Sequence, residues 1–315
     1  MWTVAQSFSV LLVFAIAARF VPKPLALLPA VVVLLAPGPW FKAFYPFCGL
    51  LAFWGMCLYL ERPSRLRAGL MGTICAFVLF FRQDIGVWAV LLSFASIALH
   101  HIFLHPRRWR NFWMEESWLL GAATILCAPF LLYMAAEDAL WPMVRGLYID
   151  TPALTASNYV SLAETMVGLA QRDLVLFLIY GFHILVSVGG FFLLFAQKSR
   201  LDRLRLGLLA VFNLLSLLPA VMMLALIRVL QADAMTWIIF TLGLGQIYRW
   251  ARAITINYPH TRHCKKVSLY SLFAVLLAVP PAIVYDIYKT QGSRSALPLY
   301  TGNIRSLLNQ NRPFN

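Results

Sequence analysis

Two apolar runs joined by three polar residues decide the fold of this chain: LRAGLMGTICAFVLFF, then Arg82-Gln83-Asp84, then IGVWAVLLSFASIALHHIFLH, together Leu66–His105. Each run approaches the roughly 20 residues that a helix needs to cross the bilayer core. Arginines flank the pair at both outer ends, at positions 62, 65, 67, 107, 108 and 110. We therefore expect a helical hairpin whose basic ends face one side of a membrane and whose Arg-Gln-Asp turn reaches the other.

The rest of the chain has the same character. Of its 315 residues 61% are hydrophobic and 12% are charged, whereas a soluble domain has about 25% charged residues. Lipid cannot satisfy backbone donors and acceptors, so runs this apolar must be helices. The sequence predicts an all-α fold, a polytopic transmembrane helical bundle of about ten membrane helices. The expected spans are residues 5–20, 25–36, 46–60, 66–81, 85–105, 118–136, 174–197, 206–227, 235–250 and 267–288.

Two regions are expected outside the spans. In the loop 137–172, apolar residues from Tyr159 to Ala170 recur at helical spacing, which predicts an extracytoplasmic amphipathic helix on the membrane surface. Residues 1–288 would form the transmembrane domain, and the polar residues 289–315 an extracytoplasmic tail.

Charge predicts the orientation. When the loop after the third span is assigned to the cytoplasm, most of the 26 Lys and Arg fall on that side, as the positive-inside rule requires. The net charge of +14 is thereby explained, and nucleic acid is not an expected partner. Both chain ends would then lie outside, and Met1 begins almost directly in a span. Either the short run 25–36 is not a span, or the chain is a fragment lacking an earlier span and loop, and we favour the fragment.

Two external Arg/Asp pairs are the candidate binding residues. Arg82 and Asp84 lie at the hairpin turn, and Arg228 and Asp233 in an expected polar break between the eighth and ninth spans. A guanidinium offers fixed donors matched to phosphate oxygens, and the aspartates could orient it or bind a sugar hydroxyl. The alternative is that both pairs only make polar turns that contact water and headgroups, and bind no ligand.

Other polar residues are interpreted structurally. His183, Asn213 and Gln246 lie within spans, where such side chains usually hydrogen-bond to neighbouring helices. His100, His101 and His105 are expected on a solvated face at a cytoplasmic helix end, without carboxylates nearby. The five cysteines form no CxxC pair. No metal site or cofactor is predicted, although a need for a divalent ion stays open.

The segments GPWFKAFYPF (38–47), GLMGTICAFVLFFRQDIGVWA (69–89) and RVLQADAMTWIIF (228–240) resemble the polytopic bacterial glycosyltransferases of the GT-C type, the superfamily of the protein mannosyltransferases and the aminoarabinose transferase. The resemblance implies a multi-pass inner-membrane enzyme with an extracytoplasmic active site, which moves a sugar from a polyprenyl-phosphate carrier to an acceptor. An acidic residue in the first external loop normally activates that acceptor. This chain has no such loop, so its catalytic residues stay unknown.

Two other functions remain open. A membrane transporter or flippase predicts ionisable residues near the membrane middle and repeated broken helices, and neither pattern is evident in the sequence. An O-antigen ligase or polymerase also handles lipid-linked sugars outside the cytoplasm. That class predicts a larger external loop containing His and Arg, whereas the loop here has no His.

Overall fold

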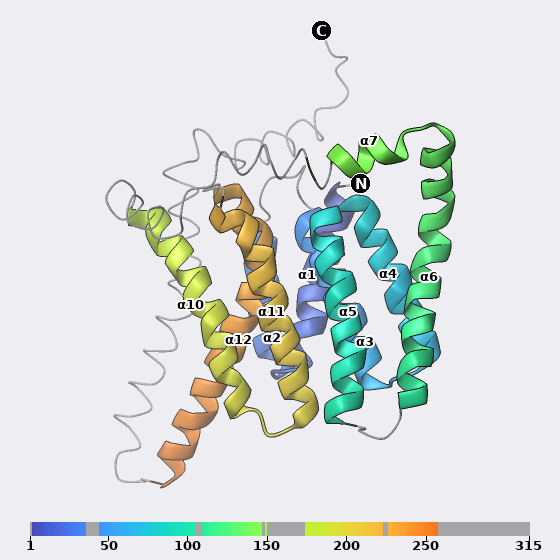
Figure 1. Cartoon of the computed structure of the whole chain (residues 1–315). Helices are drawn as coiled ribbons and strands as arrows, with labels where there is room; N and C mark the ends of the chain where they lie inside the picture. The colour runs from blue at the N-terminus through green and yellow to red at the C-terminus, as the bar shows by residue number, and fades with distance from the viewer. Residues whose placement is uncertain are drawn as a thin grey trace, which may run out of the picture.

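The computed structural model describes residues 2–35, 44–104, 109–146, 149, 174–222 and 226–257. Within these ranges every regular element is a helix (Figure 1). The helices are α1 (Trp2–Ala17), α2 (Lys23–Leu35), α3 (Phe44–Glu61), α4 (Arg65–Phe81), α5 (Gln83–Phe103), α6 (Trp109–Ala136), α7 (Leu140–Arg145), α10 (Leu174–Ala196), α11 (Arg200–Met222) and α12 (Leu226–Asn257).

The all-helical prediction is confirmed for the described residues. Every expected span from the first to the ninth falls on a helix, and the tenth, 267–288, lies outside the described residues. Among the described residues, three helices are long and apolar enough to cross a membrane, namely α3, α5 and α6. The protein therefore has the character of a membrane protein, while the count of about ten spans stays a prediction.

The helices alternate in direction, so the bundle has two chemically different ends (Figure 1). We call the basic end the one where α1, α3 and α5 finish and α4, α6 and α11 begin. There the Nε of Arg19 lies 2.6 Å from Oε1 of Glu61, and Nη2 of Arg205 lies 3.9 Å from the same oxygen. These ion pairs bring the ends of α1 and α3 together with the start of α11. The hairpin end is the opposite one, where α4 gives way to α5.

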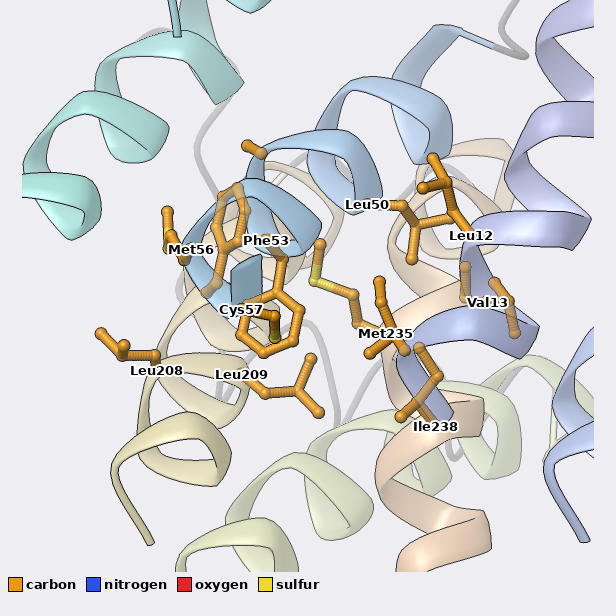
Figure 2. Packing of buried hydrophobic residues seen from close by; sticks show 14 of the residues in the cluster. Leu12, Val13, Leu50, Phe53, Met56, Cys57, Leu208, Leu209, Met235 and Ile238 are labelled. Atoms are coloured by element: carbon orange, nitrogen blue, oxygen red, sulfur yellow. The ribbon is translucent and has the colours of Figure 1, made fainter. Parts of the chain in front are cut away.

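The core lies where α1, α3, α11 and α12 meet (Figure 2). It joins the helices that precede α7 to the group α10–α12 in one hydrophobic cluster. The side chains labelled in Figure 2 are Leu12, Val13, Leu50, Phe53, Met56, Cys57, Leu208, Leu209, Met235 and Ile238. Because lipid is as apolar as leucine, such contacts stabilise a membrane bundle through close packing.

Helix α6 packs against α4 through small residues. A Cβ added at Gly72 would lie 2.1 Å from the carbonyl oxygen of Leu119, so only glycine permits this approach. The other face of α6 exposes large apolar side chains, including Trp113, Ile125 and Leu132. A helix that is packed on one side and apolar on the other is typical of the edge of a membrane bundle.

Three predicted boundaries differ from the structure. The expected polar break at 228–233 is wrong, because α12 begins at Leu226 and is helical through these residues. Helix α6 begins at Trp109, well before the expected start at 118. In the loop 137–172 the structure has the short helix α7, and the expected surface helix at 159–170 lies outside the described residues, as does the tail 289–315.

Candidate functional site

A single residue, Arg82, separates α4 from α5 in the helical hairpin. Its backbone N–H donates to the carbonyl of Val78 at 2.7 Å, and its own carbonyl accepts from the N–H of Gly86 at 2.7 Å. A Cβ at Gly86 would lie 2.6 Å from Cα of Leu79, so the two helices meet too closely for any other residue there. The predicted Arg-Gln-Asp turn is thus confirmed, with Gln83 and Asp84 already in the first turn of α5.

Arg82 is held between an aromatic ring and a carboxylate. Its Nε donates to Oδ1 of Asp84 at 3.0 Å, and its Nη2 donates to Oδ2 of the same carboxylate. The guanidinium carbon lies 2.9 Å from the ring centroid of Tyr45, in the first turn of α3. The side chain of Arg82 is 17% exposed and that of Asp84 is 44% exposed. The cation is therefore oriented at the molecular surface by two groups from two helices.

This geometry suits anion binding, with one condition. The edge formed by Nε and one Nη is the fork that binds a carboxylate or phosphate in a bidentate manner. Asp84 occupies this edge in the structure. A phosphate ligand would have to displace the carboxylate or approach the guanidinium from another side. Asp84 thus both orients Arg82 and competes with an incoming anion.

The second predicted pair lies on a helix. Arg228 and Asp233 belong to the first turns of α12, which begins at the hairpin end and runs antiparallel to α11 (Figure 1). Their side chains lie outside what the structure describes. The expectation that they share a cavity with Arg82 and Asp84 therefore stays a prediction.

Asn213 behaves as expected for a polar residue within a span. Its Nδ2 donates to Oγ of Ser187 on α10 at 2.7 Å, and its Oδ1 accepts from Oγ1 of Thr236 on α12 at 3.2 Å. These bonds tie α10, α11 and α12 together, which confirms the structural interpretation of Asn213. The Oε1 of Gln246 instead accepts from Arg249 one turn further along α12, at 2.6 Å and 3.1 Å.

The expectation for His100 and His101 is wrong. Both side chains are buried, and Nε2 of His101 lies 2.9 Å from Oε2 of Glu115. The carboxylate comes from the early turns of α6, which the sequence analysis placed in a loop. His105 lies outside the described residues.

The sequence did contain a signal for this contact. Once α6 begins at Trp109, Phe112, Glu115, Glu116 and Leu119 recur at the i, i+3, i+4, i+7 spacing of one helix face. The two glutamates thus lie on the face that turns toward the bundle, and both are buried. Periodicity could have identified them, whereas average hydropathy could not.

Within the described part of the chain, no group of three or more His, Cys, Asp or Glu is arranged to hold a metal ion. No protein-family model, no curated protein and no solved structure matches the chain.

Proposed function

We propose that this chain, or the longer protein of which it is a part, is a membrane glycosyltransferase that binds a polyprenyl-phosphate-linked sugar at the hairpin end and transfers the sugar to an extracytoplasmic acceptor. The observation that carries the proposal is the guanidinium of Arg82, held at the surface between Tyr45 and Asp84. A fixed guanidinium matches phosphate oxygens in geometry and charge. The same cation would stabilise the lipid phosphate as it departs.

Displacing Asp84 from Arg82 costs little free energy. Ion pairs at exposed positions contribute about 0–1 kcal/mol, and Asp84 is 44% exposed. Charge-assisted hydrogen bonds to a desolvated phosphate contribute about 1.5–3 kcal/mol each. A phosphate that reaches Arg82 at the membrane surface therefore offsets the loss of the Asp84 contact.

Direct binding tests the site. Purified protein in lipid nanodiscs is titrated with a radiolabelled polyprenyl-phosphate sugar. Arg82→Ala should weaken binding by roughly 10- to 100-fold, which corresponds to the loss of one charge-assisted bond. Asp84→Asn should tighten binding several-fold, because the bidentate edge of Arg82 is released. Arg203→Ala, which removes an exposed cation at the basic end, is the matched control and should leave binding unchanged. Equal affinity for wild-type and Arg82→Ala protein rejects the site.

Sidedness tests the orientation on which the proposal depends. In a cysteine-free background, Gln83→Cys should react with a membrane-impermeant maleimide added outside intact cells. Asp202→Cys, in the first turn of α11 at the basic end, should react only after the cells are opened. Labelling of position 83 from the cytoplasm alone would reject an extracytoplasmic site.

A transporter or flippase is the second candidate, because buried ionisable residues occur after all. Glu115, Glu116 and His101 are buried, although they lie at the basic end and not near the middle of the bundle. Proteoliposomes that move a lipid-linked sugar across the bilayer without transferring the sugar would favour this function. Sugar transfer to an acceptor without translocation would favour the glycosyltransferase.

A further inference from the structure

Five ionisable side chains gather inside the basic end of the bundle, and we call them the buried glutamate cluster. Tyr59 comes from α3, His100 and His101 come from α5, and Glu115 and Glu116 come from α6. None of them is more than 7% exposed. Acidic residues are almost never buried unless they are paired, so the partners of the two glutamates decide what the cluster can do.

Glu115 is fully engaged. Its Oε2 accepts a hydrogen bond from the hydroxyl of Tyr59 at 2.5 Å and lies 2.9 Å from Nε2 of His101. The ring of His100 packs edge-on against both Tyr59 and His101, with centroids 5.9 Å and 5.3 Å apart. Glu115 therefore has polar partners on two neighbouring helices, α3 and α5.

Glu116 has the opposite environment. It is 4% exposed, and neither carboxyl oxygen has a hydrogen-bond partner in the structure. Among the described residues no cation lies within ion-pair distance of it. Adjacent residues on one helix thus hold two carboxyl groups, one with two hydrogen-bond partners and one with none.

Of the charged groups on the neighbouring helices, Arg65 of α4 is exposed and the others are engaged elsewhere. Helix α6 packs on α4, α5 and α7. At this end α4 contributes Arg67, whose Nη1 donates to the carbonyl of Leu58. Helix α5 contributes the two histidines, and Arg145 of α7 lies beyond the far end of α6 (Figure 1). Outside the cluster, α3 contributes Glu61, which pairs with Arg19.

An ionised carboxylate in this position would be very costly. Removing an ion from water without a partner costs several kcal/mol even after the protein relaxes, and a second negative charge on the adjacent residue adds repulsion. A neutral carboxyl group left without a hydrogen bond costs about 1–3 kcal/mol. Binding one proton to Glu116 therefore removes most of the cost.

We propose that Glu116 is a proton-binding site, with Glu115 as its hydrogen-bonded neighbour. One proton adds to the Glu116 carboxylate to give a neutral acid, and no other bond changes. The contacts of Glu115 with His101 and Tyr59 hold that neighbouring carboxyl group in place and leave Glu116 without a partner. This site lies at the end of the bundle opposite to Arg82 and does not depend on sugar binding.

Infrared spectroscopy tests the proposal without any substrate. Wild-type protein in lipid at neutral pH should show the carbonyl-stretch band of a protonated carboxylic acid, and the band should shift in heavy water. Glu116→Gln should abolish this band. Glu137→Gln, which removes an exposed glutamate just after α6, should leave the band intact. In Glu115→Gln protein the band should remain and shift, because the adjacent carboxyl group is gone.

A second measurement, on wild-type protein, tests the proposal even when a variant fails to fold. Wild-type protein grown with glutamate isotopically labelled at the side-chain carboxyl carbon should show the same band displaced by the label. Three results would each overturn the proposal. The wild type could lack an exchangeable acid band, or its band could be unchanged by the glutamate label. The band could also survive in folded Glu116→Gln protein.

Discussion

Replacing Tyr59 by phenylalanine isolates one buried hydrogen bond. The side chain is 0% exposed, and its hydroxyl donates to Glu115 at 2.5 Å. The substitution keeps the ring in the core and removes only the donor. Hydrogen bonds to charged groups contribute about 1.5–3 kcal/mol, whereas interhelical bonds in membranes reach at most about 1.7 kcal/mol. The two ranges overlap near 1.5 kcal/mol, so we expect the free energy of unfolding to fall by about that amount. This lowers the ratio of folded to unfolded protein roughly tenfold.

The measurement is reversible unfolding in mixed micelles with rising dodecyl sulfate, followed by circular dichroism. A double-mutant cycle with Glu115→Leu separates the bond from the ring. Without its acceptor the Tyr59 hydroxyl is unsatisfied, so Tyr59→Phe should then cost nothing or stabilise the protein. Tyr133→Phe, at a tyrosine 61% exposed, should stay within about 0.5 kcal/mol of the wild type. An equal cost of Tyr59→Phe in both backgrounds would refute the bond.

The same unfolding assay checks two packing contacts. Gly72→Ala places a carbon 2.1 Å from the carbonyl oxygen of Leu119, so α4 and α6 must separate and stability should fall by about 1–3 kcal/mol. Gly121→Ala is the control, because its Cβ would meet no atom within 4 Å, and it should be neutral or stabilise by up to about 1 kcal/mol. Asn213→Leu removes the bond to Ser187 and should cost about 1 kcal/mol. Unchanged stability in either Gly72→Ala or Asn213→Leu would contradict the packing described.

Hydropathy located chain reversals within a few residues but did not locate helix ends. The reversal at Arg82 is predicted correctly because both flanking runs are long enough to cross a bilayer. The reversal between the eighth and ninth spans was placed at 228–233, yet α12 already begins at Leu226. The segment 228–233 contains no glycine or proline, so nothing in it ends a helix. The segment 109–118 has no helix breaker either, and α6 begins there although half of its residues are polar.

The candidate sites differ in how far the sequence could predict them. Arg82 and Asp84 are neighbours in the chain, so a local pattern was enough to place them together. The contact between His101 and Glu115 crosses from α5 to α6 and depends on which face of α6 turns inward. A window average of hydropathy mixes the faces of a helix and cannot show this. The phase of α6, set by Phe112 and Leu119, was the available signal.

Carboxyl groups at the two ends of the bundle lie in different electrostatic environments. At the hairpin end the carboxylate of Asp84 is exposed to water and pairs with Arg82. At the basic end water is excluded and Glu115 takes both nearby donors, which leaves Glu116 only a proton to offset its charge. Salt screens exposed pairs strongly and buried charges weakly. Ionic strength should therefore loosen the Asp84 contact, whereas only hydrogen-ion activity should act on Glu116.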